Sequence, residues 1–178
     1  MDRMPPPQPP DTAIPAHRIA IRDTDPAAPD AQACLAAYFA ELEARIEGGF
    51  DPGDAAMADM DAMRPPLGAF LIATCDGLPV ACVALRGDGS DTGEVKRLWI
   101  APAARGLGLA RRMMTAIEGR ARTLGMTHLR LDTNRVLTEA VALYLRLGWT
   151  AIPRYNDNPH AHHWFAKDLP VADRPAPG

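Results

Sequence analysis

The chain has 178 residues, 47% of them hydrophobic, which is enough for a single domain with a substantial core. Its formal net charge of -3 disfavours a general nucleic-acid-binding protein, because such proteins are usually basic overall. Apolar runs fall short of the roughly 18 residues that a membrane span needs. The 3 cysteines lack CxxC spacing, so neither a disulfide framework nor a zinc ribbon is indicated. We therefore expect a cytoplasmic protein with no membrane and no nucleic-acid partner.

The N-terminal segment is rich in proline. Residues 1–16 include the run PPPQPP, which cannot bury apolar surface, so we expect a disordered arm there, with a ligand for an SH3-type domain as the alternative. Polar and apolar side chains alternate over HRIAIR, residues 17–22, which predicts a half-buried strand. Apolar residues then recur at helical spacing from Leu35 to Ile46 and are followed by a glycine pair, which predicts an amphipathic helix.

Residues 50–66 are expected to form a loop in which methionines recur at every third position. This spacing predicts one face of a short helix packed on the core, or else a flap that contacts a substrate. Two apolar runs, at 68–75 and 78–86, flank an Asp-Gly turn and predict a β-hairpin. The methionines of the loop at 50–66 are Met57, Met60 and Met63.

The segment 94–112, EVKRLWIAPAARGLGLARR, predicts a strand, a tight turn and a helix in quick succession. A helix N-terminus has amide groups without intrahelical partners, and its dipole favours negative charge. Gly106 and Gly108 lack the Cβ atoms that would keep a phosphate away from the backbone. The arginines that lie off the apolar stripe of this helix either add to such a site or form a solvated face. The turn therefore predicts a site for a phosphate-bearing cofactor.

The C-terminal part of the chain alternates between strand and helix patterns and then ends in a flexible tail. The order of all these elements favours an α/β fold in which a mixed sheet carries helices on both faces. We expect one domain over residues 17–169. The C-terminal elements are a strand at 127–133, a helix at 136–147, a closing strand pair at 150–155 and 162–167, and the tail at 170–178.

Phosphate-binding motifs differ in how well they fit the turn. The P-loop pattern GxxxxGK[ST] is absent, and residues 106–110 are a poor match for GxGxxG. RGLGLA instead matches R-x-x-G-x-A and resembles the [QR]-x-x-G-x-[GA] motif of the GNAT acetyltransferases. The resemblance extends to the strand VKRLWIAP, to Asn134, to A-x-x-LY-x-x-x-GW at 140–149 and to the closing YNDNPHAHHWFAKDL. It covers residues 94–169, whereas residues 17–86 match in topology alone.

The resemblance implies the GNAT acyl-CoA N-acyltransferase fold, a mixed and mostly antiparallel sheet whose central strands splay apart to hold acetyl-CoA. The pyrophosphate is expected on the backbone amides of the turn, and the pantetheine arm along the preceding strand. Asn134 is expected to hold the pantetheine as well. The implied cofactor-binding residues are Leu98, Trp99, Ile100, Arg105, Gly106, Leu107, Gly108, Leu109, Ala110, Arg111, Asn134 and Tyr144.

Two side chains are the implied catalytic residues. Tyr144 matches the family tyrosine that protonates the departing thiolate, and a phenol with a pKa of about 10 suits that role. A tyrosine on an amphipathic helix is otherwise a core residue. Glu94 is the candidate base for the amine, acting through water, although a surface ion pair with Lys96 or Arg97 explains its presence equally well. A backbone N–H near Leu98 would polarise the carbonyl.

Three histidines near Asp157 raise the question of a metal. In an H-x-H-H strand adjacent histidines point to opposite faces, so at most two of the three converge, and we predict no metal site. The histidines then either line the pocket for the acceptor or are ordinary strand and loop residues. They are His160, His162 and His163.

Together these patterns predict an acetyl-CoA-dependent N-acetyltransferase that moves an acetyl group directly to a primary amine of a small molecule. A protein or peptide N-acetyltransferase is the alternative within the class of enzymes. A non-catalytic acyl-CoA-binding module is the alternative outside it. The acceptor half, residues 17–86, carries no motif that identifies the amine, and assembly as a homodimer stays open.

Overall fold

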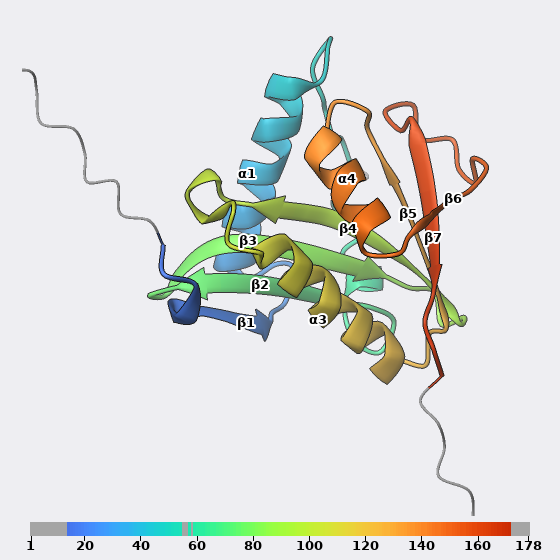
Figure 1. Cartoon of the computed structure of the whole chain (residues 1–178), viewed down its shortest axis with the longest axis horizontal. Coiled ribbons are helices and arrows are strands. Elements are labelled where there is room, and N and C mark those ends of the chain that lie inside the picture. The colour runs from blue at the N-terminus through green and yellow to red at the C-terminus, as the bar shows by residue number, and fades with distance from the viewer. Residues whose placement is uncertain (1–13, 55–56, 58, 172–178) are drawn as a thin grey trace, which may run out of the picture.

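The computed structural model describes residues 14–54, 57 and 59–171. Over this part of the chain, 7 strands form one sheet in the order β1-β2-β3-β4-β5-β7-β6 (Figure 1). Neighbouring strands are antiparallel except for β4 and β5, which are parallel. The predicted mixed and mostly antiparallel sheet is therefore confirmed. The strands are β1 (Ile19–Asp23), β2 (Ala69–Cys75), β3 (Leu78–Arg86), β4 (Thr92–Ile100), β5 (His128–Thr133), β6 (Thr150–Ala151) and β7 (His163–Asp168).

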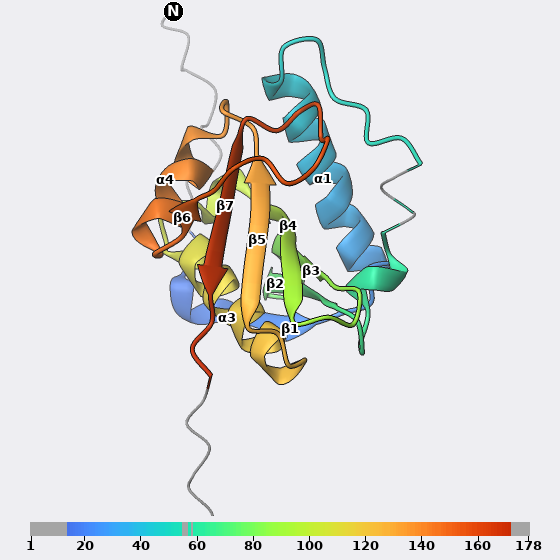
Figure 2. The same ribbon diagram turned by 90° about the vertical axis from the view of Figure 1, so that its right-hand side faces the viewer.

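Helices cover both faces of the sheet, as predicted: α3 and α4 lie on one side of it and α1 lies on the other (Figure 2). Because successive strand side chains point to opposite faces, Leu71 packs in the core cluster that includes α3, while Phe70 and Ile72 pack in the cluster that includes α1. The helices are α1 (Pro29–Arg45), α3 (Leu109–Thr123) and α4 (Thr138–Arg146), and the 3₁₀ turns are η1 (Ala16–Arg18), η2 (Asp61–Met63) and η3 (Pro102–Ala104).

The acceptor half differs in detail from the sequence prediction. The helix predicted to begin near Leu35 begins at Pro29, because proline is tolerated at the first helical position, where its missing N–H has no intrahelical acceptor. In the loop that follows, Met60 and Met63 are buried, with Met63 at the end of η2, as expected for residues packed on the core. Met57 is 63% exposed and does not share their environment.

The closing strand pair is shorter than the predicted 150–155. β6 is limited to Thr150–Ala151, although Ile152 still donates its N–H to the carbonyl oxygen of Trp164 over 2.9 Å. The next residue, Pro153, has no N–H to donate to the ladder. Pairing therefore ends there, and the chain leaves the sheet as a loop.

The predicted arm at 1–16 lies outside the described residues except for its last three. Of these, Ile14 packs against the core cluster that includes α3. The predicted tail at 170–178 also lies outside the described residues from 172 onward. Among the helices in the described part of the chain, none combines the length and the apolar character needed to cross a membrane. The cysteines Cys34, Cys75 and Cys82 are buried free thiols.

β4 and β5 pair over a short distance and then separate. The parallel ladder reaches only from Thr92 to Glu94 on β4, while β4 itself continues to Ile100. On its other edge β4 stays paired with β3, but the register shifts at a bulge that contains Arg97. The parting of these central strands agrees with the predicted splay. It opens the sheet at the place where the predicted site residues lie.

Candidate active site

The turn between η3 and α3 has the geometry of an anion site. Gly106 and Gly108 have left-handed backbones, with φ of 78° and 71°, and Gly108 is the N-cap of α3. Within the described part of the chain, the backbone amides from Gly106 to Arg111 donate to no backbone acceptor. The first turn of α3 also contains no acidic side chain. Such a run of free N–H groups at a helix N-terminus binds phosphate groups.

The space in front of these glycines is open. A Cβ atom placed on Gly106 or Gly108 would meet no protein atom within 4 Å, so a ligand has room to approach the amides there. The left-handed backbone itself disfavours residues other than glycine. By its donor groups and by its shape, the turn therefore fits the pyrophosphate of acetyl-CoA.

A groove of about 370 Å³ extends from this turn to β4 and α4. It brings together most of the predicted cofactor-binding residues. Leu107 does not line it, because its side chain packs against the core cluster that includes α3. Since β4 has no partner strand on this side beyond Glu94, its backbone polar groups are available to a ligand. The predicted residues in the wall are Leu98, Trp99, Ile100, Arg105, Gly106, Gly108, Leu109, Ala110 and Arg111.

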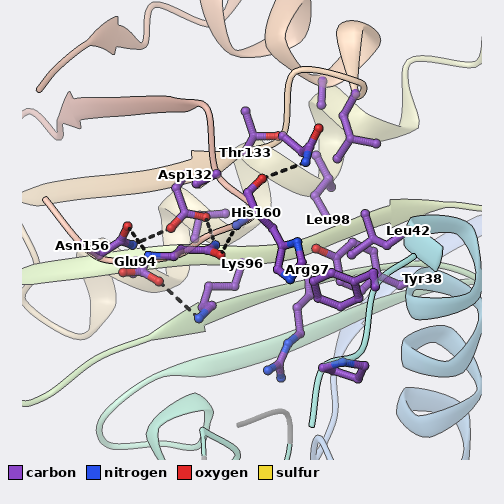
Figure 3. A pocket seen from close by; sticks show the side chains of 18 of the residues that line it. Tyr38, Leu42, Glu94, Lys96, Arg97, Leu98, Asp132, Thr133, Asn156 and His160 are labelled. Atoms are coloured by element: carbon purple, nitrogen blue, oxygen red, sulfur yellow. Dashed lines mark hydrogen bonds and ion pairs between the residues drawn. The ribbon is translucent and has the colours of Figure 1, made fainter. Parts of the chain in front are cut away.

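A second cavity, of about 570 Å³, adjoins the groove. Figure 3 shows this cavity from close by, with Glu94 on one side and Tyr38 on the other. The predicted residues Asn134 and Tyr144 line it together with Glu94, rather than lining the groove. A ligand in the groove and a ligand in the second cavity would therefore meet at the shared wall, and the second cavity is called the acceptor cavity below. The shared residues are Tyr38, Leu42, Leu98, Leu137 and Ala140.

Tyr144 lies on α4 and is 6% exposed. Its ring centroid lies 6.0 Å from that of Trp149 and 6.0 Å from that of Phe165, so the ring is part of the core. The residue also lines the acceptor cavity. Burial raises the pKa of Tyr144 well above its ordinary value, with smaller contributions from Tyr38 and Asp132. The hydroxyl thus keeps its proton at neutral pH, and packing in the core is compatible with a role as proton donor.

Glu94 is 7% exposed and occupies the last pair of the β4–β5 ladder. Its carboxylate lies 3.4 Å from Lys96 Nζ, so an ion pair with Lys96 is present, but it lies in the wall of the cavity rather than at the surface. Beside it, the Tyr155 hydroxyl is buried without a hydrogen-bond partner among the described residues. Burial and the negative charge of Glu94 raise the pKa of Tyr155. Glu94 is therefore placed where it could take a proton from a ligand in the cavity.

The side-chain amide of Asn134 makes hydrogen bonds to two backbone groups of the protein. Its Nδ2 donates to the carbonyl oxygen of His160 over 2.7 Å, and its Oδ1 accepts from the N–H of Val136 over 3.0 Å. The residue thereby holds the loop that carries His160 against the segment that enters α4. One N–H and one lone pair of the side-chain amide remain for the predicted contact with pantetheine.

The three histidines lie in different surroundings. His160 lines the acceptor cavity, and its ring meets that of Phe50 edge to face with 4.9 Å between centroids. His162 accepts the N–H of Arg135 at Nδ1 over 3.3 Å, and His163 begins β7. Across the described residues, the histidine, cysteine and carboxylate side chains form no group of three or more that could hold a metal ion. His160 alone therefore matches the expected lining of the acceptor pocket.

Glu41 on α1 holds two of the predicted cofactor-binding residues. Its Oε2 accepts from Arg105 Nη2 over 2.7 Å and from Trp99 Nε1 over 3.1 Å. Arg105 also donates from Nε to the carbonyl oxygen of Ile100 over 3.0 Å. Sequence reasoning missed Glu41, because α1 and β4 are far apart in the chain and no local pattern connects them.

Other wall residues of the acceptor cavity come from β5 and the loop before β7. Asp132 accepts from the side-chain amides of Asn156 and Asn158, the latter over 3.2 Å. Asn156 also accepts from Trp164 Nε1 over 2.9 Å. The alternating asparagines of YNDN were the only sequence signal for this network. The wall residues that sequence analysis did not single out include Tyr38, Arg97, Asp132, Tyr155 and Asn156.

The groove ends in a turn of free amide groups and adjoins a second cavity, an arrangement suited to a phosphate-bearing cofactor and a second ligand. Comparison with known families makes this assignment specific. The model of the acetyltransferase (GNAT) family matches residues 35–149, and the chain belongs to this family.

Curated relatives are similar to part of the chain. An IAA acetyltransferase from Azospirillum brasilense is 35% identical over 94 residues, which are 52% of this chain and 61% of the relative. The uncharacterized N-acetyltransferase YjgM of Escherichia coli is 38% identical over 68 residues, which are 38% of this chain and 41% of the relative. The chain thus spans between about two fifths and three fifths of the length of these relatives.

Solved structures share the fold. An acyl-CoA N-acyltransferase structure from Klebsiella pneumoniae superposes with a TM-score of 0.68 at 26% identity, covering 85% of this chain and 97% of that one. The acetyltransferase yncA from Salmonella typhimurium was solved with its cofactor acetyl-CoA. It superposes on this chain with a TM-score of 0.58 at 18% identity, and the match covers 90% of this chain and 98% of the yncA chain. The predicted GNAT fold is therefore confirmed, and acetyl-CoA is the cofactor that the family indicates.

Proposed function

We propose that the protein is an N-acetyltransferase that takes acetyl-CoA as donor and moves the acetyl group directly to a primary amine of a small molecule. The observation that carries this proposal is the meeting of the groove and the acceptor cavity at Leu98. The cavity volume of about 570 Å³ lies in the range of small-molecule sites. The relative named IAA acetyltransferase supports the same choice.

The backbone holds the donor in this proposal. The free amides from Gly106 to Arg111 bind the phosphate groups, and the unpaired edge of β4 at Leu98 offers an N–H to the carbonyl oxygen. When bound, acetyl-CoA supplies a thioester, which is already activated for attack by an amine.

Two protons must move, and the cavity offers one group for each. Glu94 accepts the proton of the amine through water, while Lys96 balances its charge beforehand. Tyr144 donates the proton of its hydroxyl to the departing sulfur. Burial raises the pKa of Tyr144, which keeps this donor protonated at neutral pH but makes it a weaker acid toward the departing sulfur.

Thiol release from acetyl-CoA, measured with a panel of small primary amines and with short peptides, tests the proposal. We expect amine-dependent release with at least one small amine, together with its N-acetylated product by mass spectrometry. Release with peptides alone would instead favour a protein N-acetyltransferase. Acetyl-CoA binding without release for any amine would favour a non-catalytic acyl-CoA-binding module.

A further inference from the structure

Arg97 lines the acceptor cavity and is only 8% exposed. It lies in the bulge of β4 with φ of 59°, which is uncommon for a residue other than glycine. A bulge of this kind changes the direction of a side chain relative to the regular strand. In Figure 3, Arg97 lies between Lys96 and Tyr38 along the pocket. A guanidinium buried at such a position needs compensation for the water that it has lost.

The protein partners of the Arg97 guanidinium are weak. Its Nη1 donates to the Met63 sulfur over 3.4 Å, and a thioether is a poor acceptor. Its Nη2 lies 3.9 Å from Asp59 Oδ2, which is beyond hydrogen-bond distance. The guanidinium carbon lies 5.7 Å from the ring centroid of Phe39. Burial lowers the pKa of Arg97, as expected for a charge that these neighbours compensate incompletely.

Asp59 is shared among three cations. Its carboxylate lies 3.2 Å from Arg86 Nε and 3.2 Å from Lys96 Nζ, in addition to the longer approach to Arg97. Glu94 adds a second negative charge beside Lys96. This group of side chains therefore carries one positive charge in excess.

The other charged side chains of the wall are Arg130, Asp51 and Asp132, which bring the wall as a whole to four positive and four negative charges. The Arg130 guanidinium lies 4.3 Å from the ring centroid of Tyr155, and Asp132 is held by the two asparagines described above. Asp51 accepts the N–H of Gly53 over 2.9 Å. In the part of the chain that the structure describes, none of them forms an ion pair with Arg97.

We propose that the acceptor amine also carries a carboxylate, and that Arg97 binds this carboxylate and so determines the specificity of the enzyme. The inference rests on the proposed function, since it names the class of acceptor for the same cavity. The planar fork of a guanidinium matches a carboxylate through two parallel hydrogen bonds.

The positions of the residues suggest the form of this acceptor. Its amine has to lie near Glu94 and Tyr144, whereas its carboxylate lies at Arg97. Arg97 follows Glu94 by three residues on β4, so the Cα atoms of the two residues lie at most roughly 10 Å apart along the strand. The class of acceptor is therefore an amino acid whose amine and carboxylate are separated by a carbon chain.

The test compares acceptors that differ only in the carboxylate. A series of ω-amino acids of increasing chain length is used, each beside its carboxamide, in which the remote amine is unaltered. For the wild-type enzyme we expect kcat/KM of the best amino acid to exceed that of its carboxamide by roughly 10- to 100-fold, as for a hydrogen bond between charged groups. The difference should lie mainly in KM. Arg97→Gln should bring the ratio close to one.

Two further variants control the experiment. Arg120→Gln removes an exposed guanidinium that pairs with Asp23 on β1, away from the cavity, and should keep the wild-type ratio. Asp59→Asn removes the competing carboxylate without altering Arg97, so it should lower KM for the amino acid and not for its carboxamide, even if Arg97→Gln fails to fold.

Equal kcat/KM for amino acids and carboxamides in the wild-type enzyme would overturn the inference and leave the proposed function in place. The absence of acetylation for every amine would overturn both.

Discussion

Replacing Gly108 by valine tests the turn that holds the donor. The φ of 71° at Gly108 is a left-handed conformation, and a side chain there costs roughly 1–2 kcal/mol of backbone strain. In a chain of this size that strain lowers Tm by roughly 2–8 °C. An added Cβ meets no protein atom within 4 Å, so there is no clash in addition to the strain. We therefore expect Gly108→Val to fold.

Binding of acetyl-CoA should suffer much more than stability does. The new side chain occupies the space through which a phosphate oxygen reaches the amides from Gly106 to Arg111. Each hydrogen bond to a charged group is worth roughly 1.5–3 kcal/mol, so the loss of two weakens binding roughly 10²- to 10⁴-fold. Isothermal titration calorimetry with acetyl-CoA measures this change, and thermal unfolding of the same sample measures the strain.

Gly125→Val is the matched control. Gly125 has a φ of 82° and also meets nothing within 4 Å of an added Cβ, but it lies beyond the opposite end of α3. It therefore carries the same kind of strain and should leave the affinity for acetyl-CoA unchanged. Wild-type affinity in a folded Gly108→Val protein would refute the reasoning about the turn.

Three other predictions concern single side chains. Tyr144→Phe keeps the packing volume but loses the proton, so turnover should fall roughly 10²-fold or more at unchanged acetyl-CoA affinity; wild-type turnover would leave Tyr144 as a core residue alone. Glu94→Gln keeps the shape but not the basicity, so turnover should fall at unchanged acetyl-CoA affinity; wild-type turnover would make Glu94 only the charge partner of Lys96. The hydrogen bond that His128 Nδ1 donates to the Asp168 carboxylate raises the pKa of His128 above 6.5, so the stability that this pair contributes is fully present below that pH and is lost as pH rises through the raised pKa. NMR titration should show the raised value in the wild type and the ordinary value in Asp168→Asn.

Local patterns in the sequence predicted the backbone of the turn between β4 and α3 and the elements around it. The glycines at 106 and 108 do have the left-handed backbones that a tight turn before a helix requires. The hairpin of β2 and β3 and the strand before the turn also follow from short-range spacing. These features depend on residues that are close in the chain, which is why periodicity and turn chemistry reveal them.

The acceptor side could not be predicted in the same way. Tyr38 on α1 and Arg97 on β4 line the same cavity only because α1 packs across β4, and no spacing in the sequence records that contact. The bulge that buries Arg97 is equally invisible, because the run VKRLWIAP reads as a regular strand. Glu94 was a candidate from its position on the strand, but its burial beside Tyr155 depends on the loop that precedes β7.

The central claim is that the acetyl group passes directly from the donor groove to the acceptor cavity at Leu98. The pattern of initial rates, with acetyl-CoA and the best amine varied together, tests this claim most directly. Direct transfer requires both substrates to be bound at once, so the double-reciprocal lines should intersect, and enzyme incubated with acetyl-CoA alone should keep its mass. Parallel lines, together with an acetylated enzyme that passes its acetyl group to the amine, would contradict the account.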